Sequence, residues 1–94
     1  MDRNEVRELL VKAIAEIQHQ SGRPVDTLDD EMRPISDLEG FDSLNSEEVV
    51  VILLEDLVFE EDLNPFEGDD GAELTIGQIA DRLAKVSKRK EKVS

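Results

Sequence analysis

Residues 43–58, SLNSEEVVVILLEDLV, contain the longest apolar run of the chain and could form either a buried strand or a helix. The stretch opens with Asp42 and Ser43, two residue types that cap helices. It continues with Glu47 and Glu48, whose negative charge suits a helix N-terminus. No other segment reads as a partner strand. We therefore predict a helix over residues 43–58.

The apolar residues of this predicted helix do not share one face. One stripe consists of Val49, Val50, Leu53 and Leu57, and a second consists of Val51, Leu54 and Val58. A helix that is apolar on more than one face is either sandwiched between neighbours or leaves an apolar strip exposed. The second stripe is therefore a candidate contact surface.

Two further helices are predicted on either side of this stretch. Apolar residues recur at helical spacing over residues 5–20 and again over residues 75–87. Gly22 ends the first of these helices. Thr75 and Gln78 stand at the spacing of a capping box, which marks the start of the second.

The connecting segments complete the predicted fold. Residues 22–41 show no sustained period and read as a long loop held to the core by spaced apolar side chains. These are Val25, Leu28, Met32, Ile35, Leu38 and Phe41. Residues 59–73 are acidic, are broken by proline and glycine, and have room for at most one short helical turn.

We predict an all-α fold, a small four-helix bundle of three main helices and one short helix with a long first loop. The helical domain is expected to span residues 1–87, followed by a disordered basic tail at 88–94.

The charge of the chain is strongly segregated. Its 94 residues carry 24 acids and 11 bases, a net charge of −13. Residues 24–80 hold eighteen acids and one base, whereas residues 81–94 hold two acids and six bases. Such a chain repels nucleic acid and anionic membranes, has no segment for membrane insertion, and favours basic partners. We expect a cytoplasmic monomer.

The side chains that usually carry catalysis are scarce. There is one histidine, His19, and no cysteine. No window has the spacing of a calcium-binding loop, so we expect no specific metal site. We expect a protein that is not an enzyme, because it lacks an evident base, nucleophile pair or metal centre.

The most informative motif is DLEGFDSL at residues 37–44. It places Ser43 at or beside the start of the helix predicted over residues 43–58. The unpaired N–H groups and the positive dipole end of a helix N-terminus would stabilise a phosphate ester on that serine. The alternative interpretation of Ser43 is a plain helix N-cap.

Over nearly its whole length the chain resembles the acyl carrier protein family. The resemblance rests on the order of an amphipathic first helix, a long anchored loop, the motif of residues 37–44, an acidic apolar helix, a short third helix and a capped fourth helix. It implies that Ser43 carries 4′-phosphopantetheine, on which acyl intermediates of fatty-acid or polyketide-like biosynthesis are held as thioesters. It also implies two kinds of partner: a phosphopantetheinyl transferase, and acyl-loading and acyl-processing enzymes with basic docking patches.

The residues expected to contact these partners lie along the helix predicted over residues 43–58. They are Asp42, Leu44, Glu48, Val51 and Glu55. Two alternatives stay open at this point. The chain could be an aminoacyl or peptidyl carrier of the same fold, or an acidic helical interaction module that is never modified.

Overall fold

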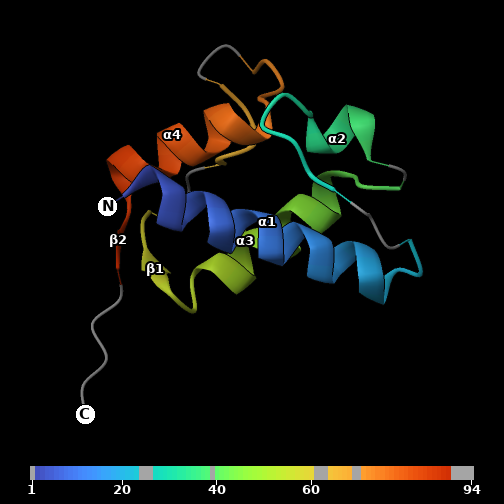
Figure 1. The fold of residues 1–94 in the computed structure, drawn as a ribbon, viewed down its shortest axis with the longest axis horizontal. Helices are drawn as coiled ribbons and strands as arrows, with labels where there is room; N and C mark the ends of the chain where they lie inside the picture. Colours follow the sequence, from blue (N-terminus) through green and yellow to red (C-terminus); the bar gives the residue numbers. More distant parts are fainter. Residues whose placement is uncertain (1, 24–26, 39, 61–63, 69–70, 90–94) are drawn as a thin grey trace.

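The computed structural model describes residues 2–23, 27–38, 40–60, 64–68 and 71–89, and it is mostly helical (Figure 1). In chain order its elements are α1 (Arg3–Gln20), α2 (Pro34–Asp37), α3 (Ser43–Leu53), β1 (Leu57–Val58), α4 (Ile76–Val86) and β2 (Lys88–Arg89). A small helical bundle is therefore confirmed in outline.

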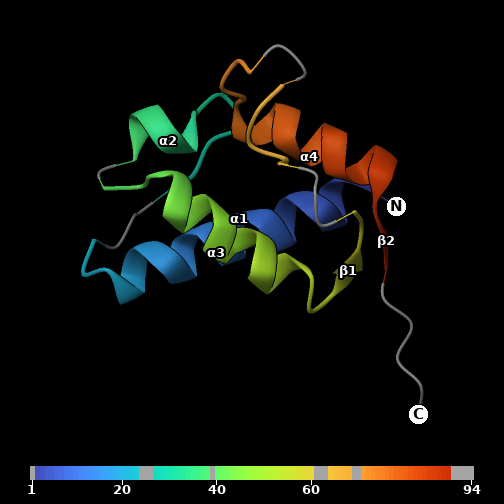
Figure 2. The same ribbon diagram turned by 180° about the vertical axis from the view of Figure 1, so that it is seen from behind.

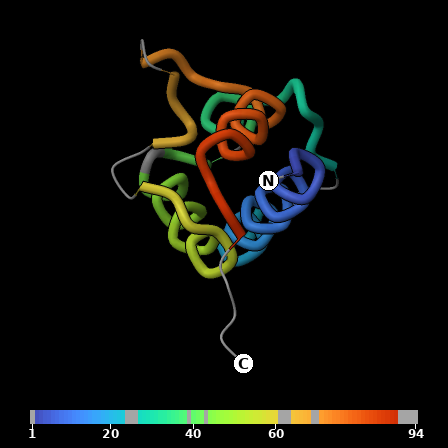
Figure 3. Tube along the Cα trace, turned by 90° about the vertical axis from the view of Figure 1, so that its left-hand side faces the viewer, coloured from blue at the N-terminus to red at the C-terminus, as the bar shows by residue number. Residues whose placement is uncertain are grey.

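α1 is the helix against which the other two long helices pack. Asp2 caps it by accepting a hydrogen bond from the N–H of Asn4 at 2.9 Å. Its buried stripe, which includes Val6, Leu10 and Ile14, follows the predicted helical spacing. Both α3 and α4 contact α1 (Figure 2), and the end-on view in Figure 3 shows the three long helices around a common interior.

α3 ends five residues earlier than predicted. The sequence predicts a helix to residue 58, but α3 stops at Leu53 and the chain turns through residues 54–56. The N–H of Glu55 bonds to the carbonyl of Ile52, and the N–H of Asp56 bonds to that of Leu53, which tightens the last turn. Two adjacent carboxylates at the negative end of a helix dipole disfavour its continuation.

A two-stranded ribbon replaces the end of the predicted helix. Leu57 pairs with Arg89, and Val58 pairs with Lys88, in antiparallel register. Leu57 is buried in the core, as predicted from its place in the first apolar stripe, but it belongs to β1 and not to a helix. The prediction that no partner strand exists is therefore wrong. Lys88 and Arg89, which were assigned to a disordered tail, form β2, and the rest of that tail lies outside the described residues.

A short helix lies in a segment for which none was predicted. α2 forms inside the loop of residues 22–41, with Pro34 at its first turn, where a missing N–H costs nothing. Residues 64–68 and 71–73 contain a hydrogen-bonded turn, from the N–H of Glu67 to the carbonyl of Asn64, and no helix, while residues 61–63 and 69–70 of the predicted segment lie outside the described residues. Instead, Glu67 and Glu73 form an isolated antiparallel bridge.

The long loop is anchored to the core as predicted. Leu28, Leu38 and Phe41 are buried, while Val25 lies outside the described residues. The ring of Phe41 contacts the ring of Phe66, with 5.8 Å between their centroids. This contact ties the loop that precedes α3 to the segment that follows β1.

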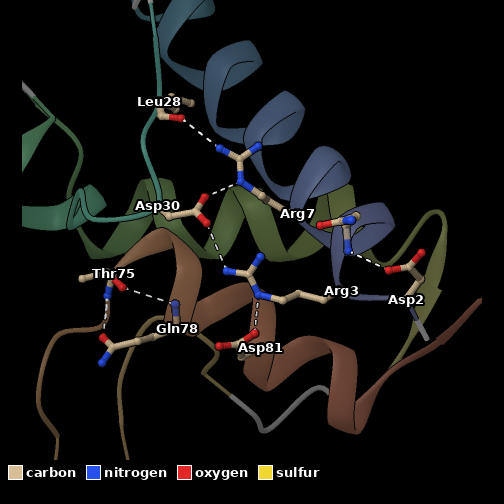
Figure 4. A network of polar contacts seen from close by, with 9 residues as sticks. Asp2, Arg3, Arg7, Leu28, Asp30, Thr75, Gln78 and Asp81 are labelled. Carbon is tan, nitrogen blue, oxygen red and sulfur yellow. Dashed lines mark hydrogen bonds and ion pairs between the residues drawn. The ribbon is translucent and has the colours of Figure 1, made fainter.

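Polar contacts fix the middle of the same loop (Figure 4). The carboxylate of Asp30 pairs with the guanidinium groups of both Arg3 and Arg7. Arg3 also pairs with Asp81 of α4. These two arginines hold the pKa of Asp30 below its usual range, mainly through the hydrogen bond from Arg7 and then the one from Arg3. The carbonyl of Asp30 accepts the N–H of Gly77 at 2.9 Å, so the loop also covers the start of α4.

Candidate functional site

The start of α3 places Ser43 at the first helical position. The N-cap is Asp42, whose carboxylate accepts the N–H of Asn45 at 3.0 Å. In return, the side-chain oxygen of Asn45 accepts the N–H of Asp42 at 3.3 Å, which completes a capping box. The interpretation of Ser43 as a plain N-cap is therefore wrong, because that role belongs to Asp42. The capping box does not depend on the serine.

The turn before α3 is fixed by one glycine and one buried ring. Gly40 has a φ of +72°, a conformation that residues with a Cβ rarely adopt. Phe41 follows it and is only 2% exposed. A glycine turn followed by a buried aromatic anchor sets the direction in which the chain enters α3.

The guanidinium of Arg23 lies against this turn. A Cβ added to Gly40 would lie 2.3 Å from Nη1 of Arg23 and 2.5 Å from its Cζ. The glycine therefore provides room for an arginine as well as a positive φ. Arg23 is a cation next to a segment whose charged side chains are otherwise mostly acidic.

The residues predicted to contact partners are all exposed. Leu44 is 63% exposed and Val51 is 65% exposed, which are large values for aliphatic side chains. Together with Glu48 they follow the i, i+4, i+7 spacing of one helix face. Asp42 is the N-cap and lies just before the first turn of α3. Glu55 is exposed in the turn after α3, so it is beyond the helix on which it was predicted.

The opposite side of α3 faces the core. Ser46, Val49 and Leu53 are buried along it. Because the buried and exposed residues of α3 occupy opposite faces, the exposed aliphatic side chains do not belong to the core. The site therefore combines a serine at a helix start with an acidic, partly apolar helix face beside it.

The start of α3 is suited to binding an anionic group. The first N–H groups of α3, at Ser43 and Leu44, have no acceptor within the helix. They and the helix dipole favour an anionic group at this end. The shifted pKa values among the described residues belong to Asp30 and Arg3, in the network at the start of α1.

Several features of the site were not predicted from the sequence. The partnership of Asp42 with Asn45 has a visible signal, an Asp followed three residues later by a side chain that can accept a hydrogen bond. The contact of Arg23 with Gly40 has none, because it joins residues seventeen positions apart in a segment without a period.

Other predicted features fall outside this site. His19 is exposed in the last turn of α1. Within the described part of the chain, no three His, Cys, Asp or Glu side chains gather as metal ligands. The described helices also include none that is long and apolar enough to cross a membrane.

Comparison with known proteins gave no match to this chain among protein-family models, curated proteins or solved structures.

Proposed function

We propose that this protein is a non-catalytic carrier that holds acyl intermediates as thioesters on 4′-phosphopantetheine attached to Ser43. The observation that carries the proposal is the position of Ser43 as the first residue of α3, directly after the N-cap Asp42. The motif of residues 37–44, through which the chain resembles acyl carrier proteins, lies at this helix start.

The local structure suits a phosphodiester at Ser43. The free N–H groups at the start of α3 and its dipole stabilise the negative charge of a phosphate. Asp42 and Glu48 are nearby acids, so the helix start and Arg23 provide the favourable electrostatic contribution. When bound, phosphopantetheine supplies a thiol that forms the thioester, and no cysteine of this chain could do so.

The exposed face of α3 suits the partners that a carrier needs. A phosphopantetheinyl transferase and the enzymes that load and process acyl groups must each approach Ser43. Leu44 and Val51 offer apolar contacts next to it, and Glu48 lies on the same face. A basic docking patch on the enzyme would be attracted by this face and by the acidic residues 24–80. Pathways of fatty-acid or polyketide-like biosynthesis use such carriers.

The decisive experiment is intact mass spectrometry of the chain after incubation with coenzyme A and a phosphopantetheinyl transferase of broad specificity. We expect a mass increase equal to one phosphopantetheine group, located at Ser43 by peptide mapping. The Ser43→Ala variant should keep the helical circular dichroism of the wild type, because Asp42 and Asn45 make the cap. It should show no mass increase.

Ser46 offers a matched control for position. It lies one turn further along α3 and is buried, so Ser46→Ala should leave the adduct unchanged. An adduct that persists on Ser43→Ala would refute the site. A wild-type chain that is never modified would favour the unmodified interaction module. Loading of the modified chain by an amino-acid adenylating enzyme rather than an acyl-loading enzyme would favour the aminoacyl or peptidyl carrier.

A further inference from the structure

Arg23 lies where the end of α1 meets the turn before α3. Its N–H donates to the carbonyl of Gln18 at 2.8 Å, and Gly22, with a φ of +75°, turns the chain just before it. These features hold the backbone of Arg23 at the end of α1, and from there its side chain reaches Gly40. Figures 1 and 2 both show the end of α1 and the start of α3 at the same end of the molecule.

Gly40 provides the surface on which this guanidinium lies. A Cβ at position 40 would lie 2.3 Å from Nη1 of Arg23, 2.5 Å from Cζ and 2.9 Å from Nε. The guanidinium therefore rests on backbone that carries no side chain, and any other residue at this position would displace it. The contact is specific to the pair of Arg23 with a glycine.

The charge of Arg23 has no partner within the part of the chain that the structure describes. Arg3 and Arg7 both pair with Asp30. The guanidinium of Arg23, in contrast, forms no ion pair or hydrogen bond with a described residue. Arg23 is also exposed, so a ligand can approach it. A planar guanidinium presents its N–H donors as a fork that matches two oxygen atoms of a phosphate.

The surroundings of Arg23 are otherwise acidic. Four acids lie within three sequence positions of Arg23 or of Gly40, namely Asp26, Asp37, Glu39 and Asp42. Asp37 and Asp42 are exposed, whereas the other two lie outside the described residues. A phosphate close to this turn is repelled by these acids, and Arg23 is the cation that lies against the turn.

Ser43 lies within reach of this cation. It follows Gly40 by three residues, so the Cα atoms of the two are at most about 11 Å apart. The guanidinium already lies over Gly40, and the long side chain of an arginine can rotate to meet a phosphodiester carried by Ser43.

We infer that Arg23 pairs with the phosphate of the phosphopantetheine group on Ser43 and positions the first part of that group. This inference rests on the carrier function proposed above. The pair joins the end of α1 to the start of α3 through the modified serine. Modification should therefore stabilise the folded chain, and this gain in stability depends on Arg23.

The test compares thermal melts of the unmodified and the fully modified chain at low salt, with the modification checked by intact mass. Modification should raise the melting temperature of the wild type about 2–4 °C more than that of Arg23→Gln, which is the size expected of one exposed ion pair in a chain of this length. Arg23→Lys keeps the charge but not the fork, so it should retain part of the difference.

Arg89→Gln is the matched control. It removes the same charge from another exposed arginine, in β2, at the end of the molecule opposite the start of α3 (Figure 1). Modification should raise its melting temperature as much as that of the wild type. If modification has the same effect on the wild type and on Arg23→Gln, Arg23 does not contact the phosphate, and the inference is wrong.

Salt separates the charge of Arg23 from its packing on Gly40. At 1 M salt the screening length is about 3 Å, so the difference between the wild type and Arg23→Gln should largely disappear. A difference that stays the same at 1 M salt would show that Arg23 acts through packing, and it would overturn the inference.

A measurement on the wild type alone does not depend on how the variants fold or are modified. The NMR signal of the Nε–H group of Arg23 should shift on modification, while that of Arg89 should not. An unchanged Arg23 signal in a chain of increased mass would overturn this inference and leave the proposed function intact. A wild-type chain with no mass increase would refute both.

Discussion

α3 and α4 are equal in length and both begin with a capping box, yet their apolar residues are buried to different extents. Each has eleven residues and a capping box, Asp42 with Asn45 in α3 and Thr75 with Gln78 in α4. α4 buries its large apolar residues along one face, where Ile76, Ile79 and Leu83 are fully buried. α3 buries one face as well, but it leaves two aliphatic side chains in solvent.

The difference shows which residues the fold requires. In α4 the apolar pattern is explained by packing against α1, since nearly every large apolar side chain is in the core. In α3 the core explains Val49 and Leu53 but not Leu44 or Val51. Residues that the core does not need are the ones available for partners, and in α3 they lie next to Ser43.

The largest expected effect comes from removing one leucine from each helix. Leu83→Ala should lower the free energy of unfolding by about 2–5 kcal/mol, because it opens a cavity in the core. Leu44→Ala should change it by less than about 0.5 kcal/mol, because that side chain is already in water. Urea unfolding followed by circular dichroism measures both. A loss for Leu44→Ala as large as that for Leu83→Ala would show that the exposed apolar residues of α3 also support the fold.

The second prediction concerns how the chain enters the two helices. The N-caps Asp42 and Thr75 both have an extended backbone, but two residues before Asp42 the chain passes through Gly40 at a φ of +72°. Gly40→Ala should cost about 1–2 kcal/mol of stability, because a Cβ is strained in the left-handed region. It must also displace the guanidinium of Arg23.

Gly22 provides the matched control for this substitution. Its φ is +75°, but a Cβ added there would meet nothing within 4 Å. Gly22→Ala should therefore lower the melting temperature through backbone strain alone. Any further decrease in Gly40→Ala measures the cost of displacing Arg23. If both substitutions lower the melting temperature equally, the side chain of Arg23 moves away from the new Cβ at little cost, and Gly40 is needed only for its positive φ.

Much of this comparison could be predicted from the sequence. The spacing of apolar residues predicts α1 and α4, Thr75 with Gln78 marks the start of α4, and the capping residues before the apolar run predict α3. These signals are local, since a helix is defined by residues three and four positions apart. The exposure of Val51 also follows from a helix with two apolar stripes, whereas Leu44 belongs to neither stripe.

The parts that were not predicted depend on distant residues. Leu57 and Val58 fit the helical period of the preceding residues, and only pairing with residues 88–89, thirty positions later, makes them a strand. The turn that ends α3 has a weak local signal in Glu55 and Asp56, but helices often tolerate such pairs. The contact of Arg23 with Gly40 is likewise set by the tertiary fold rather than by its neighbours in sequence.

The smallest predicted effect concerns Asp30, which ties the long loop to α1 and to the start of α4. Because Arg7 and Arg3 lower the pKa of Asp30 in the folded state, its ionised form is favoured more in the folded chain than in the unfolded one. This contribution is present above the pKa of the unfolded chain, near 3.9, and is lost as the pH falls through the lower pKa of the folded state. The side chain is 40% exposed, so solvent screens the pairs and the contribution is at most about 1 kcal/mol.

Asp30→Asn should therefore lower the free energy of unfolding by up to about 1 kcal/mol at pH 7, and the difference from the wild type should shrink below about pH 4. Urea midpoints measured between pH 7 and pH 2 test this, with Asp29→Asn as a control that removes the same charge from an exposed neighbour. A difference that stays constant down to pH 2 would show that Asp30 acts through its shape or hydrogen bonds rather than its charge.

In either case the stability of α3 should change less than that of α4. The reason is that α4 contains Gly77, whose N–H bonds to the carbonyl of Asp30, and Asp81, which pairs with Arg3. Hydrogen exchange of the amides of Ile76–Val86 and of Ser43–Leu53 would show whether the loss of Asp30 is felt mainly at α4.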